Sequence, residues 1–312
     1  LIMRVGILGG SGFVGQALAA RLAADGHRVR VWTRRRERHR ELLVLPELEL
    51  VEGDVYQPDF LREQFAGLDA VVNLVGILNE SGRSGRGFFR AHAELPERVV
   101  EAMRGVGVNR LLHMSALNAT AQAPSHYLRS KAVGEEAVRR SGLRWTIFRP
   151  SVIFGPRDSF VNRFAALLRL MPGVFPLACP DARLQPVYIG DVVHAYAQAL
   201  TDERTVGQQY NLCGPEACTL REIVTRIAGW TGRRVRIIGL NRMLSFAQAL
   251  VMEFAPGKPF SLDNYRSLQL DSVCPGPFPA IFGLEPASLE TIVPTYLNAG
   301  RRFDRLRVNA RR

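Results

Sequence analysis

Residues 4–15 read Arg-Val-Gly-Ile-Leu-Gly-Gly-Ser-Gly-Phe-Val-Gly, and this stretch decides the fold. The stretch 4–8, which is apolar after Arg4, predicts a strand, and residues 13–24 have a helical pattern. Gly9, Gly12 and Gly15 fall where the strand turns into the helix. Glycines there allow the sharp turn, the approach of a pyrophosphate and the close packing of the helix. The stretch predicts a dinucleotide-binding turn; the alternative is a glycine-rich turn without a ligand.

The first half of the chain alternates β-branched runs with helical patterns, which is typical of βαβ units around a parallel sheet. Six strands are expected, at residues 4–8, 28–33, 48–52, 69–75, 110–115 and 144–149, with helices at 13–24, 88–104 and 127–140. We therefore predict an α/β fold with a doubly wound parallel sheet of the Rossmann type. Residues 1–155 form the nucleotide-binding domain, and residues 156–312 form a smaller α/β lobe from which a segment after 185 returns to the sheet.

The end of the second strand indicates which nucleotide is preferred. A protein selective for NAD(H) usually places a carboxylate there, whereas this chain has Thr33-Arg34-Arg35-Arg36. A guanidinium can bind a 2′-phosphate through two parallel hydrogen bonds, so Arg34, supported by Arg35, favours NADP(H). NAD(H) remains an alternative, because the same residues can form a solvated basic turn.

Other expected cofactor contacts lie where strands end. Asp54 follows the third strand and is placed to accept a hydrogen bond from the adenine amino group, or else to cap the next turn. Gly76 follows the fourth strand, where a small residue lets the ribose approach. The remaining expected contacts are Ser11, Phe13, Val14, Val55, Val75, Met114 and Pro150.

Tyr127 and Lys131 lie four residues apart, on one face of an expected helix. The ammonium is expected to lower the pKa of the phenol and to hydrogen-bond the nicotinamide ribose. Tyr127 can then exchange the proton that accompanies hydride transfer, with Ser115 as the candidate hydroxyl that polarises the substrate. In the alternative, Tyr127 and Lys131 bind the cofactor without catalysis.

Composition narrows the class of protein. The chain has 312 residues, 47% of them hydrophobic, and 41 basic against 29 acidic side chains give a net charge of +12, which favours anionic partners. The arginines are scattered and no nucleic-acid-binding motif is present, so specific nucleic-acid binding is not expected. The histidines have no metal-ligand spacing, and no metal site is expected.

The cysteines and the apolar segments indicate in which cellular compartment the protein is expected. The four cysteines show no Cys-x-x-Cys spacing and no signal-peptide pattern is seen, so reduced thiols and a cytoplasmic location are expected. The most apolar window, residues 237–255, is interrupted by Asn241, Arg242 and Glu253, so it could lie on a membrane or close over a substrate but hardly cross a bilayer.

Together these motifs resemble the short-chain dehydrogenase/reductase superfamily in its extended or atypical branch, and within it the NADPH-binding accessory subunits of respiratory complex I (alpha subcomplex subunit nine) and their bacterial relatives. The segments that carry the resemblance are 9–15, 73–76, 113–118, 127–135, 149–155 and 185–192. It implies an NADP(H)-binding Rossmann domain, with contact to a membrane or respiratory complex, in which the nucleotide can be structural. The chain departs from the active extended enzymes at Ala116, where they usually carry the substrate-polarising hydroxyl.

Three hypotheses follow. The first is an oxidoreductase that uses NADP(H) on a quinone-like or lipid-like substrate. The second is a nucleotide-stabilised accessory or assembly protein of a respiratory or quinone-synthesis complex at the membrane. The third is a sugar-nucleotide epimerase or dehydratase, because Arg149-Pro150, Gln185-Pro186-Val187 and Asp191 resemble the substrate-side framework of that branch.

Overall fold

The computed structural model describes residues 2–171, 173–255 and 257–297, which form two compact units. The first unit runs to Pro150 and also contains Val192–Leu212, whereas the second contains Ser151–Asp191 and the chain from Cys213 onward. The chain thus leaves the first unit and later returns to it. The division falls at Pro150, the last residue of strand β6.

A seven-stranded parallel sheet forms the centre of the first unit, and its strand order is β11-β6-β5-β4-β1-β2-β3. This confirms the predicted doubly wound sheet, with β11 as a strand beyond the six predicted. The strands are β1 (Arg4–Leu8), β2 (Arg28–Thr33), β3 (Leu48–Glu52), β4 (Ala70–Asn73), β5 (Arg110–Met114), β6 (Arg144–Pro150) and β11 (Gln208–Leu212).

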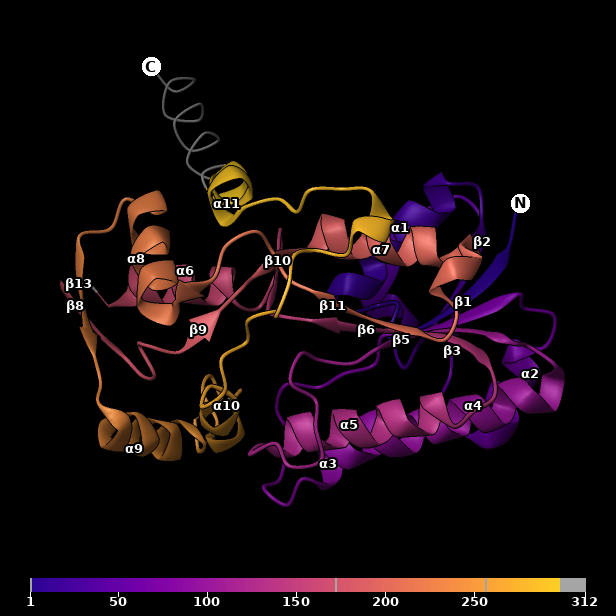
Figure 1. Ribbon diagram of the computed structural model, residues 1–312, viewed down its shortest axis with the longest axis horizontal. Coiled ribbons are helices and arrows are strands. Elements are labelled where there is room, and N and C mark those ends of the chain that lie inside the picture. The colour runs from indigo at the N-terminus through magenta and orange to yellow at the C-terminus, as the bar shows by residue number, and fades with distance from the viewer. Residues whose placement is uncertain (1, 172, 256, 298–312) are drawn as a thin grey trace. The chain divides into compact units, whose positions relative to one another are not determined.

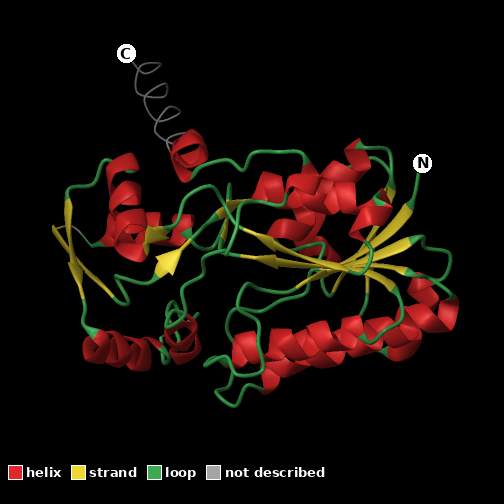
Figure 2. Ribbon diagram, in the orientation of Figure 1, coloured by secondary structure: helices red, strands yellow, loops and turns green. Residues whose placement is uncertain are grey.

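Helices cover both faces of this sheet, α1 and α7 on one and α2, α4 and α5 on the other (Figures 1 and 2). Alternate residues of a strand point to opposite faces, so Ile147 of β6 packs with α4 and α5 while the ring of Phe148 lies 4.2 Å from that of Tyr196 in α7. The elements are α1 (Phe13–Ala24), η1 (Arg36–Leu42), α2 (Pro58–Phe65), α3 (Arg86–Phe89), α4 (Leu95–Val106), α5 (His126–Arg139), α7 (Ile189–Thr201) and η3 (Glu203–Thr205).

The helix predicted at 88–104 is interrupted by a π-helical turn, η2 (Arg90–Glu94). Pro96 has no backbone N–H to donate to the carbonyl of His92 four residues earlier, so the regular pattern cannot continue there. That carbonyl instead faces α5, where a Cβ on Gly134 would lie 1.9 Å from His92 O. Gly134 therefore permits the close approach of the two helices.

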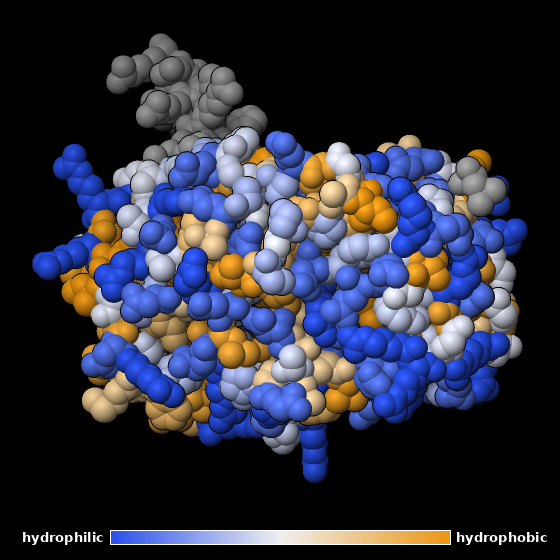
Figure 3. Space-filling model, viewed as in Figure 1, coloured by the Kyte–Doolittle hydropathy of each residue, from blue (hydrophilic) through white to orange (hydrophobic). Residues whose placement is uncertain are grey.

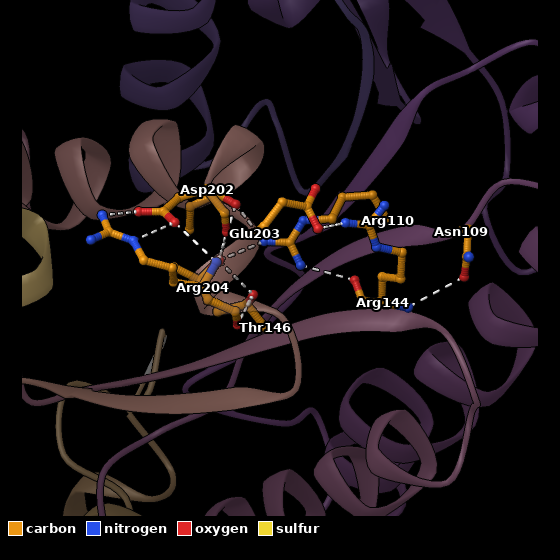
Figure 4. A network of polar contacts seen from close by, with 9 residues as sticks. Asn109, Arg110, Arg144, Thr146, Asp202, Glu203 and Arg204 are labelled. Carbon is orange, nitrogen blue, oxygen red and sulfur yellow. Dashed lines mark hydrogen bonds and ion pairs between the residues drawn. The ribbon is translucent and has the colours of Figure 1, made fainter.

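Arg110 holds the returning segment against the sheet (Figure 4). Arg110 is 7% exposed, and its guanidinium donates to Arg144 O at 2.9 Å, to Thr205 Oγ1 at 2.9 Å and to Ala199 O. Burial lowers the pKa of Arg110 to about 10. A buried cation thus joins β5 and β6 to the segment between α7 and β11.

The second unit has its own core, in which α6, α8 and α11 pack with β8. Buried members include Phe175, Ile223, Ile227 and Val293. Its strands form three two-stranded sheets, β10-β7, β12-β9 and β13-β8. The elements are β7 (Ile153–Phe154), α6 (Val161–Leu170), β8 (Gly173–Leu177), β9 (Arg183–Leu184), β10 (Val187–Tyr188), β12 (Cys218–Thr219), α8 (Leu220–Trp230), β13 (Val235–Gly239), α9 (Arg242–Met252), α10 (Leu262–Ser267), η4 (Ala280–Phe282) and α11 (Leu289–Leu297).

The expectation that all four cysteines are reduced is wrong for one pair. Cys213 and Cys274 form a disulfide across a sequence separation of 61 residues, whereas Cys179 and Cys218 are free. Their spacing gave no sign of this, because the fold brings together two cysteines that belong to no short motif.

Candidate functional site

The glycine turn joins β1 to α1 at the carboxyl edge of the sheet. Gly9 has a φ of 76°, which favours glycine, and a Cβ there would lie 3.0 Å from Leu74 C and Val75 N at the end of β4. The backbones that follow two neighbouring strands therefore almost touch. Gly12 N donates to Gly9 O at 3.0 Å, which closes the turn just before Phe13 begins the helix.

Gly12 and Gly15 differ in what surrounds them. A Cβ on Gly12 would meet only Gly9 O, at 3.2 Å, whereas a Cβ on Gly15 would lie 2.2 Å from Gly9 O and 2.5 Å from Gly10 Cα. Gly15 thus sets how closely α1 packs on the turn, and Gly12 leaves space beside it. No side chain caps the N-terminus of α1, so the amides around Ser11, Phe13 and Val14 are not covered by a cap.

Arg34 and Arg35 follow β2 and are exposed. Among the residues that the structure describes, neither guanidinium forms an ion pair, although Arg21, Arg30 and Arg40 do. A hydrogen bond from Arg35 N to Thr33 Oγ1, at 3.3 Å, stabilises this turn. Both cations are therefore available to an anionic ligand.

Asp54 lies in the turn after β3, where its Oδ1 accepts a hydrogen bond from Tyr56 N at 3.0 Å. One carboxylate oxygen thus takes the capping role that the sequence left open, while the exposed side chain retains its other oxygen. Val55 beside it is partly buried. The cation of Arg90 lies 4.4 Å from the centre of the Tyr56 ring and borders the same turn.

Lys131 connects the ends of β4 and β5. Its Nζ donates to Met114 O at 3.0 Å and to Val75 O at 3.4 Å, and the side chain is 3% exposed. An ammonium has three N–H donors, so one has no partner among the described residues. A Cβ on Gly76 would lie 3.4 Å from Nζ, so this glycine keeps the backbone beside the ammonium open.

Tyr127 lies one helical turn before Lys131, and its ring contacts Phe88 and His92 edge-on with centroids 6.1 and 5.4 Å apart. The expectation that Lys131 lowers the pKa of this phenol is wrong for the structure, because burial raises the pKa of Tyr127 to about 12. Burial lowers the pKa of Lys131 to about 8. The phenol of Tyr127 is therefore neutral at physiological pH.

Ser115 and Pro150 lie at the ends of β5 and β6. Ser115 N donates to Phe148 O at 2.8 Å, and Pro150 O accepts from Leu117 N at 3.0 Å. Ser115 is 2% exposed, and its Oγ has no hydrogen-bond partner among the described residues, so it is not bonded to Tyr127. The structure brings Lys131, Val75 and Met114 together but leaves the candidate hydroxyl buried and separate.

The sequence did not predict a buried polar layer behind Lys131. Asn73 accepts from Val75 N at 3.1 Å, so its amide NH₂ faces His113 Nδ1, 3.3 Å away. This makes His113 Nε2 the protonated nitrogen, and it has no partner among the described residues. Burial lowers the pKa of His113 to about 3, so the imidazole is neutral. The sequence did carry a signal for this layer, namely the polar residues Asn73 and His113 within otherwise apolar strands.

A second histidine joins the loop after β4 to α5. Ser130 Oγ donates to Tyr127 O at 2.8 Å, so it accepts from His92 Nδ1 at 2.9 Å. Ile77 N in turn donates to His92 Nε2 at 3.0 Å. The pKa of His92 lies well below its usual value, first because of burial and then because Lys131 and His113 are near. This neutral imidazole fixes the helix that carries Tyr127 and Lys131.

The residues of the first unit fit a nicotinamide dinucleotide. The open side of Gly12 and the uncapped start of α1 suit a pyrophosphate, Arg34 and Arg35 suit a 2′-phosphate, and the third N–H of Lys131 suits a ribose hydroxyl. Tyr127 lies one turn away with a proton to donate. The arrangement can hold a nucleotide and supply a proton beside it.

The buried ammonium of Lys131 makes a testable contribution to stability. Its pKa is about 8 in the folded protein against 10.5 for a solvent-exposed lysine, so between these pH values the unfolded chain binds more protons and stability rises with pH. From pH 7 to 10 the unfolding free energy of the wild type should rise by about 2–3 kcal/mol relative to Lys131→Met. Urea unfolding over this range tests this; parallel curves for the two proteins would contradict it.

The chain is similar to a known protein family and to several characterised proteins. The model of the NAD dependent epimerase/dehydratase family matches residues 5–213. The mitochondrial NADH dehydrogenase (ubiquinone) 1 alpha subcomplex subunit 9 of Mus musculus is 30% identical over 251 residues, which cover 79% of this chain and 66% of that protein. This chain therefore spans slightly less than two thirds of that relative.

Two further similarities extend the comparison. The ceramide reductase of Caulobacter vibrioides is 33% identical over 190 residues, which cover 60% of this chain and 57% of that protein. The crystal structure of the dTDP-glucose 4,6-dehydratase DesIV from Streptomyces venezuelae, with NAD bound, covers 96% of this chain and 97% of its own with a TM-score of 0.70. Its sequence identity is 20%, so this likeness shows the fold alone.

Proposed function

The chain belongs to the NAD dependent epimerase/dehydratase family, and from this premise we propose that it binds NADP(H) and reduces the carbonyl group of a lipid-like or quinone-like substrate. The observation that carries the proposal is the pair Tyr127 and Lys131, with the lysine held at the ends of β4 and β5 beside the glycine turn. The similarity to a reductase named for ceramide supports a lipid-like substrate.

In this mechanism, Tyr127 donates its phenolic proton to the substrate oxygen while the adjacent carbon gains a hydride, so a ketone becomes a secondary alcohol. The bound nicotinamide supplies the hydride. Lys131 would hold the ribose of a bound nucleotide through its third N–H, and its other two N–H groups keep the ends of β4 and β5 in place. His92 and Ser130 hold the helix so that Tyr127 stays in position.

Turnover is tested by following NADPH consumption with long-chain ketones and short-chain quinones. Steady oxidation with formation of the alcohol or quinol supports the proposal. If no substrate of either class is reduced while NADPH binds stoichiometrically, the catalytic part of the proposal fails and the nucleotide-binding part stands.

Arg34 and Arg35 are proposed to select NADP(H). Replacing both by Ala should weaken NADPH binding by about 10- to 100-fold, because hydrogen bonds to a charged phosphate are lost. The Kd for NADH should change by less than about threefold, since NADH lacks that phosphate. Arg38→Ala, in the same exposed stretch, is the control for nonspecific loss of positive charge, and isothermal titration measures all the affinities. An equal loss for both nucleotides would contradict selection.

A second candidate is a nucleotide-stabilised accessory protein that contacts a respiratory complex at the membrane. The buried Ser115 and the neighbouring Ala116 favour it, because no hydroxyl near the end of β5 is exposed to a substrate. The similarity to a complex I subunit also supports it. Mass spectrometry of the small molecules released on denaturation tests it: retained NADPH in stoichiometric amount without turnover favours the accessory role, and loss of nucleotide during purification opposes it.

The third alternative, a sugar-nucleotide epimerase or dehydratase, is favoured by the family match. Calorimetric titration with UDP- and dTDP-sugars tests this alternative. Saturable binding of either sugar nucleotide would show that the substrate is a sugar nucleotide and not a lipid-like molecule.

A further inference from the structure

Helix α9 in the second unit has its polarity reversed relative to an ordinary surface helix. From Met243 to Phe254 every exposed residue is apolar, and Met243, Val251 and Phe254 are 74%, 69% and 72% exposed. The polar side chains Ser245 and Glu253 are instead 1% and 7% exposed. A helix of a soluble domain normally shows the opposite pattern.

The buried polar residues have partners inside the second unit, so the inward face of α9 is specifically fixed. Ser245 Oγ accepts from Cys179 N at 3.0 Å. Glu253 Oε1 accepts from Lys258 Nζ at 2.6 Å, and its Oε2 accepts from Leu262 N at 2.9 Å. The orientation that exposes the apolar side chains is therefore the one that satisfies these polar groups.

The exposed apolar side chains form one face. Residues 243, 247, 250 and 251 follow the spacing i, i+4, i+7 and i+8, which places them along one side of the helix, and Phe254 lies in the turn that follows the helix. Leu244 and Phe246 flank this side and are 47% and 46% exposed. The neighbouring sheet adds Val174 of β8 and Ile238 of β13, at 48% and 43%. Orange and pale-orange side chains reach the left and lower-left surface in Figure 3, where Figure 1 draws β13 and α9.

Exposed arginines are frequent in the segments that carry this face, whereas Glu253 at the end of α9 and Asp263 in the neighbouring α10 are buried. Residues 159–180 and 230–252 contain no Asp or Glu. They contain six arginines, all exposed: Arg163, Arg169, Arg233, Arg234, Arg236 and Arg242. In the register of the small sheet Val174 lies opposite Arg236, so apolar and basic side chains alternate there.

We propose that this face, α9 with the exposed side chains of β8 and β13, binds the surface of an anionic lipid bilayer. An apolar helix face can enter the boundary between headgroups and acyl chains while flanking arginines reach the phosphates. A second copy of the chain is a poor occupant, because it would bring two arrays of six arginines together. None of the helices in the described part of the chain is long and apolar enough to span a bilayer. The inference is independent of the proposed chemistry.

Sedimentation of the whole protein with vesicles tests the proposal. The wild type should bind phosphatidylcholine vesicles that contain phosphatidylglycerol, bind pure phosphatidylcholine vesicles much more weakly, and lose affinity as salt rises from about 0.05 to 0.5 M. Val251→Asp combined with Phe254→Asp should lower the affinity by at least about tenfold. Val44→Asp is the matched control, because Val44 is 80% exposed and lies in the other unit.

Two further variants test the contributions of the arginines and of the apolar helix face separately. Arg234→Glu with Arg236→Glu should weaken binding about tenfold at low salt and little at high salt, with Arg38→Glu as control. Val251→Trp keeps the face apolar, so it should bind like the wild type and show an added blue shift of fluorescence on anionic vesicles. The proposal is overturned if the wild type binds neither kind of vesicle, if the Asp variant binds like the wild type, or if the face instead buries itself in a dimer or against an acidic protein.

Discussion

Tyr127→Phe is expected to lower kcat for carbonyl reduction by about 10³-fold and to change the Kd for NADPH by less than about threefold. The substitution removes only the phenolic oxygen and keeps the ring that contacts Phe88 and His92, so the helix should stay in place. A raised pKa, about 12, means that the phenol holds its proton at neutral pH and can donate it. Stopped-flow measurement of a single turnover gives the rate of this step.

Tyr210→Phe is the matched control, because it removes a hydroxyl from β11 in the same unit, on a strand outside the proposed site. It should leave kcat within about twofold. If Tyr127→Phe retains wild-type turnover, Tyr127 is not the proton donor. If neither the wild type nor the variant turns over while both hold NADPH, the accessory role is the better description.

Gly15→Val should abolish nucleotide binding, raising the Kd for NADPH by at least about 100-fold. A Cβ at Gly15 would lie 2.2 Å from Gly9 O and 2.5 Å from Gly10 Cα, and both are backbone atoms that cannot turn aside. The helix must therefore move away from the turn, and the free energy of unfolding should fall by about 1–3 kcal/mol. Calorimetric titration and urea unfolding measure the two effects.

Gly229→Ala provides the comparison, since Gly229 lies in α8 with no atom within 4 Å of a Cβ placed there. Alanine should stabilise this helix by about 0.5–1 kcal/mol without affecting NADPH. Full nucleotide affinity in folded Gly15→Val would show that the pyrophosphate binds elsewhere.

The sequence predicted the parts of the fold that local patterns determine. The bounds expected for β1, α1, β2 and β3 agree with the structure, because a glycine turn and short apolar runs mark where these elements begin and end. The helix at 88–104 was only partly predicted, because its π-helical turn depends on Pro96 and on the packing of His92 O against Gly134. The pairing of Cys213 with Cys274 likewise arises from the three-dimensional fold.

The candidate site was likewise predicted only in part. Spacing alone predicted that Tyr127 and Lys131 share a helix face, but it could not show that burial would raise the pKa of the phenol. The layer of Asn73, His113 and His92 also escaped prediction, because it joins residues from β4, β5 and a distant helix. Such networks form from long-range contacts, which one sequence does not display.

The path of the chain through the first unit determines when this unit can finish folding during synthesis. β11 is the partner of β6 at one edge of the sheet, and Arg110 needs acceptors at Ala199 and Thr205. In a nascent chain that has reached only Pro150, β6 is paired with β5 but its other edge is open, and Arg110 lacks its acceptors at Ala199 and Thr205. The nucleotide-binding unit cannot finish folding until Leu212 has left the ribosome, and a fragment that stops earlier should aggregate.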